Sequence, residues 1–371
     1  MKELNDIILA YDKAALQNKQ TALATVVKVI GSSYRRPGAR MLVTDDGEIT
    51  GAISGGCLEG DALRKAQFAM VEQKNKLEIY DTTDEEDHKV GIQLGCNGIV
   101  YILYEPIKQH EKNNPINLLK KVAEQRKDAV LVTIFNKNQW SQHTGTCCLI
   151  NNCESICDKE IVDVHQFSQT VLEEKKSIIK ECETHSILYQ FIPPSIQLVI
   201  VGAGNDAQPL VKMASLLGWN VIVADGRPSY ATKQRFPDAD KISIVNPAEI
   251  LSAITIDEQT AIVLMTHNYN YDMEAFEKLL TTNCRYIGLL GPKKRLDKMF
   301  NELKQKRVDI TDEKINNIYG PVGLDIGAET SEEIALSVIS EIKAVFSERH
   351  GSSLKERTTE IHNRTLIPQH E

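Results

Sequence analysis

Two cysteines lie in glycine-rich segments of the kind that bring a sulfur close to a ligand. Cys57 lies in residues 51–61, GAISGGCLEGD, directly before a segment (62–71) whose apolar spacing predicts a helix. Cys96 lies in residues 94–98, LGCNG, directly before an apolar run. Glycines let backbone N–H groups turn toward a ligand, and a helix N-terminus favours anions, including a thiolate. The two segments predict one site with a reactive sulfur beside an anion; the alternative is two small buried hydrophobic residues.

A third glycine-rich segment has the pattern of a nucleotide-binding loop. Gly202 and Gly204 follow a predicted strand, and Ala207 opens a predicted helix, so the glycines can form the turn and let a pyrophosphate approach. Asp225 ends the next strand, where it would accept a hydrogen bond from a ribose hydroxyl. Arg227 favours a phosphate instead. The alternative is a Rossmann topology whose glycines serve packing alone.

Polar residues also follow two later strands. His267 comes after the predicted strand 262–265, at the edge of a parallel sheet where ligands bind. It is a candidate for proton transfer or metal contact, with Asp272 to orient it; the alternative is a histidine that merely ends a strand. The run GPKKR at 291–295 suits an anionic substrate or, equally, a solvated helix start.

Composition and charge exclude several classes of protein. The chain has 371 residues, a formal net charge of −8 and no long run of Lys or Arg, so we expect no nucleic-acid partner. The N-terminus has no signal-peptide pattern and no window is apolar enough to span a bilayer, so we expect a cytoplasmic protein without a membrane partner. Eight scattered cysteines fit a reducing compartment in which sulfur stays free.

The first half of the chain has the pattern of an α+β domain. Apolar residues at helical spacing predict a helix over residues 4–17. Short apolar runs bounded by turn residues then predict strands. These strands cover residues 22–30, 39–43, 49–53, 77–80, 99–104 and 130–135.

The second half has the pattern of a parallel sheet. Strands are predicted at 196–201, 221–224, 262–265 and 286–290, each followed by a helix-period segment. Residues 330–333, TSEE, predict a capping box for a long closing helix. The predicted fold class is therefore α/β, with a carboxyl-terminal Rossmann-like doubly wound parallel sheet and an amino-terminal α+β domain.

The prolines at 193 and 194 mark the expected domain boundary. We expect an α+β domain with the glycine-rich cysteine loops over residues 1–190. A Rossmann-like domain follows over residues 195–348, and a loosely held polar tail over 349–371. No internal repeat is visible in the sequence.

Taken together, these motifs resemble the xanthine dehydrogenase accessory protein family (XdhC/CoxI), over roughly residues 20–110 and 195–350. In the first half the resemblance rests on GSSYRRPGARM at 31–41, SGGCLEG at 54–60 and GCNG at 95–98. In the second half it rests on RFPDAD at 235–240, TH at 266–267, IGLLG at 287–291 and GLDIGAETSEEI at 323–334. Tyr34, Asn97 and Ser331 depart from the pattern, which has Pro, Gly and Pro at these places.

The resemblance implies a chaperone for the molybdenum cofactor, as molybdopterin or its dinucleotide form. Such a protein binds the cofactor, protects it from oxidation, assists its sulfuration and inserts it into an apo-molybdenum hydroxylase such as xanthine dehydrogenase. It is an accessory or insertion factor rather than a turnover enzyme. A cysteine desulfurase-type sulfur donor is the implied second partner, and a homodimer is the usual state for such a chain.

The resemblance also assigns roles to particular residues. Cys57 and Cys96 would contact molybdenum or relay sulfur, with His267 as a third residue for chemistry. The expected cofactor-binding residues are Arg35, Arg36, Gly55, Gly56 and Glu59, with Gly202, Gly204, Ala207, Asp225 and Arg227 around the second loop. That loop would hold a pyrophosphate of the cofactor, or else NAD(P) or another nucleotide.

Two other functions remain open at this stage. One is an NAD(P)-dependent oxidoreductase that uses the Rossmann domain, with His267 as its proton relay. The other is a docking adapter that joins the hydroxylase and the sulfur donor without touching cofactor. No ligand set for a metal is predicted, because Cys147, Cys148, Cys153 and Cys157 lack a paired Cys-x-x-Cys spacing.

Overall fold

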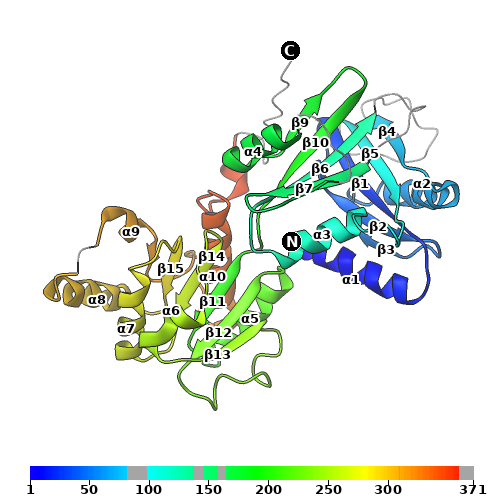
Figure 1. Cartoon of the computed structure of the whole chain (residues 1–371). Coiled ribbons are helices and arrows are strands. Elements are labelled where there is room, and N and C mark those ends of the chain that lie inside the picture. The colour runs from blue at the N-terminus through cyan, green and yellow to red at the C-terminus, as the bar shows by residue number, and fades with distance from the viewer. Residues whose placement is uncertain (82–97, 137–144, 158–163, 309, 359–371) are drawn as a thin grey trace. The chain divides into compact units, whose positions relative to one another are not determined.

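The protein is described from a computed structural model (Figure 1), which covers residues 1–81, 98–136, 145–157, 164–308 and 310–358. The chain divides into two compact units, the first ending at Pro194 and the second starting at Ser195. Within the described ranges, no helix has the length and apolar character that a membrane span requires.

The first unit begins with a helix and a five-stranded antiparallel sheet. The strands lie in the order β3-β2-β1-β5-β4, with α2 inserted in the chain between β3 and β4. The elements are α1 (Lys2–Leu16), β1 (Thr21–Gly31), β2 (Arg40–Thr44), β3 (Ile49–Gly51), α2 (Glu59–Glu72), β4 (Lys76–Asp81) and β5 (Gly98–Pro106).

The rest of the first unit repeats this arrangement. A second antiparallel sheet has the order β8-β7-β6-β10-β9, which is the order of the first sheet with every strand number raised by five. Its elements are α3 (Pro115–Glu124), β6 (Ala129–Asn136), β7 (Gly145–Asn151), β8 (Ser155–Cys157), α4 (Val164–Glu174), β9 (Ile178–Glu181) and β10 (His185–Ile192). The unit is thus an internal structural repeat, although the sequence shows none.

Each sheet of the first unit has a helix on its outer face. Figure 1 shows α2 against the first sheet and α4 against the second, and small residues such as Ala62 and Ala66 let α2 lie close to β1 and β5. The inner faces meet through two apolar clusters. In one, Val27 and Leu103 of the first sheet pack with Phe135 and Leu188 of the second. The other joins Leu23 of the first sheet to Leu131 of the second. Burial of both sheet faces fixes the register of the strands that carry the candidate site.

The second unit is a six-stranded parallel sheet in the order β13-β12-β11-β14-β15-β16. The order reverses at β11, which is the topology of a dinucleotide-binding fold. Its elements are β11 (Gln197–Val201), α5 (Ala207–Leu216), β12 (Asn220–Asp225), β13 (Lys241–Ile244), η2 (Pro247–Glu249), α6 (Ile250–Ala253), β14 (Thr260–Leu264), α7 (Tyr269–Leu279), β15 (Tyr286–Leu289), α8 (Lys293–Gln305), α9 (Asp312–Asn316), β16 (Ile318–Tyr319), α10 (Ser331–Phe346) and η3 (Leu354–Glu356).

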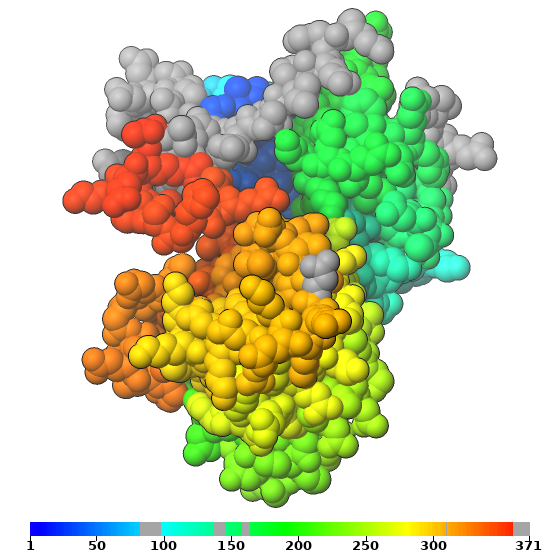
Figure 2. Space-filling view, turned by 90° about the vertical axis from the view of Figure 1, so that its left-hand side faces the viewer, coloured from blue at the N-terminus to red at the C-terminus, as the bar shows by residue number. Residues whose placement is uncertain are grey.

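Helices cover both faces of this parallel sheet. One apolar cluster joins α5 and α10 to the sheet, and a second joins α6, α7 and α8 to the opposite face. Figure 2 shows the residues from α7 to α9, coloured yellow to orange, along one outer face of the second unit. The predicted fold class is therefore confirmed in both halves.

The closing helix begins as the sequence predicts. The side chain of Thr330 accepts a hydrogen bond from the Glu333 N–H, and the Glu333 carboxylate accepts one from the Thr330 N–H. This is the predicted capping box, and the apolar residues Val338 and Ile342 behind it are buried.

Candidate functional site

Cys57 lies in the turn that joins β3 to α2. Its side chain is half-buried, and its Sγ lies 3.6 Å from the hydroxyl oxygen of Ser54. That hydroxyl also accepts hydrogen bonds from the N–H groups of Gly56 and Leu58, each at 3.1 Å. Gly56 has a φ of 110°, a conformation that only glycine adopts without strain. Ser54 therefore holds the turn together, and the Cys57 sulfur lies at the edge of the turn.

Glu59, the first residue of α2, closes this turn. Its carboxylate accepts a hydrogen bond from the Ser54 N–H at 2.9 Å and a second from the Ser54 hydroxyl. Burial raises the pKa of Glu59, but these hydrogen bonds outweigh it, so the pKa is lowered overall. The contacts seen for Glu59 are therefore those of a residue that positions the Cys57 turn, and its predicted contact with cofactor stays a prediction.

Arg35 is engaged within the protein. Its guanidinium pairs with the Glu3 carboxylate and donates to the Ala52 carbonyl at 3.1 Å, while Glu3 also accepts from the Ala52 N–H at 3.0 Å. This pairing joins the β1–β2 loop to the start of the Cys57 turn. Arg36 lies in the same loop, where its carbonyl accepts from the Ala39 N–H at 3.0 Å and closes a tight turn.

A buried charge lies behind the β1–β2 loop. Arg40 is 6% exposed and donates to the Gly38 carbonyl at 2.9 Å and to Gln190 Oε1 at 2.6 Å. Burial lowers the pKa of Arg40 to about 10, against the opposing influence of the Glu105 carboxylate. Glu105 is itself buried, which raises its pKa, and it accepts from the N–H and the hydroxyl of Thr146. Arg40 thus joins the two sheets of the first unit and has little surface to offer a ligand.

The second predicted cysteine, Cys96, lies outside the described residues. The first described residue after it, Gly98, pairs with Gly31 at the end of β1. A methyl group at Gly98 would lie 2.6 Å from the Ile30 carbonyl oxygen, so only glycine fits there. The pairing of the two thiols in one site stays a prediction.

In the second unit, the predicted glycine loop lies between β11 and α5. Gly202 has a φ of 121°, and a methyl group there would lie 2.6 Å from the backbone of Met265. Gly204 follows within the loop, and Ala207, the first residue of α5, is fully buried. The loop therefore has the close strand-to-helix packing that its sequence predicts.

Asp225 is occupied by the protein itself. It is 2% exposed and accepts hydrogen bonds from the Ala203 N–H at 2.7 Å and from the Arg227 guanidinium at 2.7 and 2.9 Å. Burial raises the pKa of Asp225, but the hydrogen bonds from Arg227 and Ala203 outweigh it and lower the pKa overall. A ribose hydroxyl would have to displace Arg227 to reach this carboxylate.

His267 pairs with Asp206, which the sequence did not single out. Its Nε2 lies 2.6 Å from Asp206 Oδ2, at the N-terminus of α5, and its side chain is 64% exposed. The expectation that Asp272 orients His267 is wrong. Asp272 is buried, accepts from the Thr266 hydroxyl at 2.6 Å and pairs with Arg295 at 2.6 Å, so its oxygens already have partners.

Sequence reasoning also missed the role of Arg235. Its guanidinium donates to the Ala203 carbonyl at 2.7 Å and to the Asn205 side chain at 2.8 Å, so it holds the glycine loop from outside. Tyr230 lies close to two arginines, with its ring centroid 4.1 Å from the Arg227 guanidinium and 4.9 Å from that of Arg235. The only signal was the RFPDAD segment, which carries the family resemblance without indicating this contact.

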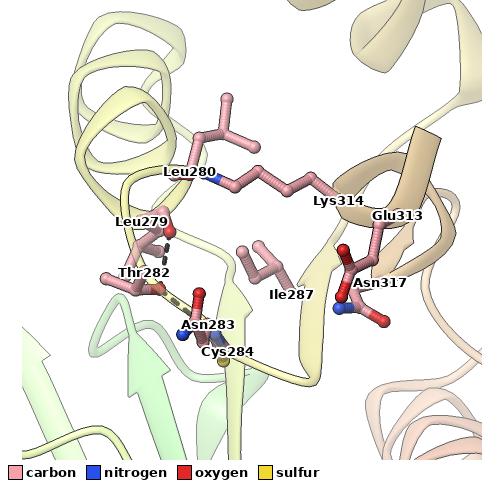
Figure 3. A pocket seen from close by; sticks show the side chains of 9 residues that line it. All are labelled: Leu279, Leu280, Thr282, Asn283, Cys284, Ile287, Glu313, Lys314 and Asn317. Atoms are coloured by element: carbon pink, nitrogen blue, oxygen red, sulfur yellow. Dashed lines mark hydrogen bonds between the residues drawn. The ribbon is translucent and has the colours of Figure 1, made fainter. Parts of the chain in front are cut away.

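A pocket in the second unit lies away from this loop. It is lined by residues of the α7 C-terminus, the start of β15 and α9, including Cys284, Glu313 and Lys314 (Figure 3). Its volume is about 90 Å³, whereas ligand pockets usually have roughly 300–1,000 Å³. It also lies at the amino end of β15, while ligands of such sheets bind at the carboxyl ends. We therefore assign it no cofactor.

Two of the remaining cysteines form a disulfide. Cys148 of β7 and Cys157 of β8 face each other across the strand pair, with a Cα–Cα distance of 4.3 Å. The expectation that all sulfur is free is therefore wrong for this pair. Among the residues that the structure describes, no group of three or more His, Cys, Asp or Glu side chains is placed to hold a metal ion.

The predicted site residues therefore gather in two groups. The first contains Cys57, Gly55, Gly56 and Glu59 in one turn, joined to Arg35. The second surrounds the carboxyl ends of β11, β12 and β14 and contains the glycine loop, Asp225, Arg227 and His267. The first group presents a sulfur on a compact turn, and the second presents an Asp–His pair and arginines beside a nucleotide-type loop.

Known families and proteins are similar to this chain in both units. Residues 14–81 match the model of the XdhC and CoxI family, and residues 198–342 match that of the XdhC Rossmann domain. The chain is 33% identical over 330 residues to a Bacillus subtilis protein named as a probable subunit of xanthine dehydrogenase, across 89% of this chain and 94% of that protein. It is 23% identical over 337 residues to the Escherichia coli molybdenum cofactor insertion chaperone PaoD, across 90% and 86% of the two chains.

A solved structure has the same fold. It is a crystal structure described as a xanthine dehydrogenase from Bacillus halodurans, with a TM-score of 0.77 and 30% sequence identity. The similarity covers 94% of this chain and 98% of that chain.

Proposed function

The chain belongs to the XdhC and CoxI family, and we therefore propose that it binds the molybdenum cofactor and inserts it into a xanthine dehydrogenase-type hydroxylase. The name of PaoD supports the insertion step, and the name of the Bacillus subtilis relative supports the kind of hydroxylase served. The cofactor is the cargo of this protein rather than a resident group.

The Cys57 turn carries the proposal. The cargo contains molybdenum and a dithiolene, and a half-buried thiol is the soft ligand that such a centre accepts. A methyl group at Gly56 would meet nothing within 4 Å, so the space beside this glycine, which precedes Cys57 in the chain, is open. The glycine turn and the thiol therefore fit the cargo, with Cys57 in contact with molybdenum or its sulfur.

The arginines fit the cargo less completely. Arg35 is paired with Glu3 and would have to leave it to bind the cofactor phosphate. Arg40 is buried, whereas Arg36 of the same loop is exposed to solvent. We propose Arg36 for this contact and assign Arg35 to holding the loop.

The dehydrogenase alternative has less support. A dinucleotide needs the Asp225 carboxylate for its ribose and the N-terminus of α5 for its pyrophosphate. The Arg227 guanidinium is already bonded to the Asp225 carboxylate, and the Asp206 carboxylate lies at the N-terminus of α5. The second unit would need both groups to move before it could bind NAD(P) in the usual manner.

The test is to replace Cys57 and to measure how much molybdenum cofactor the protein carries. We expect Cys57→Ala to fold normally, to retain less molybdenum and pterin on isolation, and to activate apo-xanthine dehydrogenase at most one-tenth as well as the natural protein, roughly the loss of one good contact. Molybdenum is counted by elemental analysis and pterin by its fluorescent oxidation product. Cys182→Ala, a half-buried cysteine on the β9–β10 connection, is the matched control.

The outcomes separate the competing functions. Natural protein that activates the hydroxylase but never carries molybdenum or pterin would identify a docking adapter instead. Turnover of NAD(P)H with a substrate would favour the oxidoreductase. Protection of the cofactor, its sulfuration by a cysteine desulfurase-type donor, a homodimeric state and a cytoplasmic location are further parts of the proposal, each requiring its own measurement.

A further inference from the structure

The β1–β2 loop places an aromatic ring on the Cys57 turn. A methyl group built at Gly55 would lie 3.4 Å from Cγ of Tyr34 and 3.6 Å from both Cδ atoms. Equal distances to the two Cδ atoms mean that Gly55 meets the face of the ring and not one edge. Tyr34 is nevertheless 69% exposed, so most of its surface is open to solvent.

The neighbouring residue fixes this ring in place. Arg35 is tied to Glu3 and to the carbonyl of Ala52, and Ala52 begins the segment that leads into the Cys57 turn. Both sides of the Tyr34–Gly55 contact are thereby anchored to the same part of the first unit. The ring is held at a defined position although most of its surface is free.

Within the described ranges, each of the other exposed aromatic rings has a cation close to it. The ammonium of Lys76 lies 3.6 Å from the ring centroid of Phe68, and the guanidinium of Arg227 lies 4.1 Å from that of Tyr230. In the described part of the chain, no cation or second ring stacks on Tyr34. An anchored ring with one covered face and most of its surface open to solvent has the form of a stacking platform for a flat heteroaromatic group.

We propose that Tyr34 binds the pterin of the molybdenum cofactor by stacking on its ring, on the turn that carries Cys57. The inference rests on the proposed function, because it concerns how that cargo is recognised. It adds a residue that binds the organic part of the cargo, where Cys57 binds the inorganic part. The hydroxyl is not required, since stacking uses the ring alone.

The experiment compares substitutions that keep or remove the ring in the full-length protein. Molybdenum cofactor released anaerobically from a molybdoenzyme is titrated into the natural protein, Tyr34→Phe and Tyr34→Leu. We expect Tyr34→Phe to bind within twofold of the natural protein and Tyr34→Leu to bind about tenfold more weakly, the usual effect of losing one stacked base. Phe68→Leu on α2 removes an exposed ring elsewhere in the same unit and should leave binding unchanged.

A competition arm identifies the stacked group. Pterin-6-carboxylate should displace the cofactor from the natural protein and from Tyr34→Phe, and should do so poorly in Tyr34→Leu. Displacement by cytidine monophosphate instead would assign the ring to a nucleobase and overturn the pterin assignment. Equal cofactor affinity of Tyr34→Leu and the natural protein would overturn the inference while the proposed function stands. A natural protein that does not bind cofactor at all would overturn both.

Discussion

The turn that carries Cys57 depends on residues within a short stretch of chain, and this made the turn predictable. The glycines, the serine and the helix start are all local, so their spacing alone predicts a glycine-rich turn that carries a cysteine. The ion pair of Arg35 with Glu3 was not predictable, because 32 residues separate its members and neither sequence position indicates the other. Two arginines assigned to the cargo from their motif, Arg35 and Arg227, thus have partners inside the protein.

Asp225 shows how a residue can match a motif and still be occupied. Its carboxylate accepts from Ala203 and Arg227, so the predicted ribose contact competes with existing hydrogen bonds. The motif fixes where the carboxylate lies, at the end of the second strand of the sheet. It does not fix what the carboxylate binds, which depends on an arginine two positions later.

We expect Asp225→Asn to lower the free energy of unfolding of the second unit by about 1–3 kcal/mol at pH 7, because a buried charge-assisted network is lost. The pKa of Asp225 is lowered in the folded state, so its contribution is complete above the unfolded pKa of about 3.9. It disappears as the pH falls through the lower, folded pKa. Urea unfolding at several pH values should therefore show the two proteins converging in acid. A constant difference down to pH 2 would contradict this account.

Among the strands, those predicted from the sequence agree with the structure in both units, but β13 and β16 of the second unit and β7 to β10 of the first were not predicted. The four strands predicted in the second unit agree with β11, β12, β14 and β15 to within two residues at each end. Buried parallel strands are continuous apolar runs, and these stand out in a sequence. In the first unit, β8 and β9 have three and four residues and are partly exposed, so the charged stretch that contains them and α4 gave no clear pattern.

The N-terminus of α5 carries a negative charge at the place where a nucleotide pyrophosphate would bind. A helix N-terminus normally attracts anions, but here it carries the carboxylate of Asp206, paired with His267. The same helix therefore accepts a pyrophosphate less readily than its glycine loop suggests. No sequence rule for the loop takes this residue into account.

We expect Asp206→Asn to bind NAD and ADP-ribose about two- to fivefold more tightly than the natural protein, because one negative charge leaves the helix N-terminus. Isothermal titration calorimetry measures the change directly. Asp238→Asn, on the loop that follows β12, removes the same charge elsewhere and serves as the control. Unchanged or weaker binding by Asp206→Asn would show that the carboxylate does not oppose the pyrophosphate.

For the protein as a whole, the disulfide matters because it joins the edge strand β8 to its neighbour. Cys148 and Cys157 stand directly opposite each other in the register, and Cys148 is fully buried. Cysteine spacing did not predict the pair, because partners in an antiparallel hairpin are set by the position of the turn. Cys147 is also buried, and only the strand register shows that Cys148 lies opposite Cys157.

We expect Cys157→Ser to lower the stability of the first unit by about 2–3 kcal/mol under oxidising conditions, the effect of opening a short cross-linked loop. In the presence of a reductant, the difference should largely disappear. Urea unfolding followed by circular dichroism tests both conditions, and thiol titration should show two fewer free thiols in the oxidised natural protein. Equal stability in the absence of reductant would mean that the bond does not form in solution.

The matching connectivity of the two sheets has a consequence for how this protein can change over time. When one fold occurs twice in a unit, one copy can keep its original function while the sequence of the other copy changes. The signature of the XdhC and CoxI family ends with β4, inside the first copy, and the cross-link lies in the second. Apart from contacts such as that of Gln190 with Arg40, we therefore expect substitutions in β6 to β10 to change the rigidity of the first unit more than the proposed cargo binding. A distant relative can lose sequence similarity in that half while it keeps the fold.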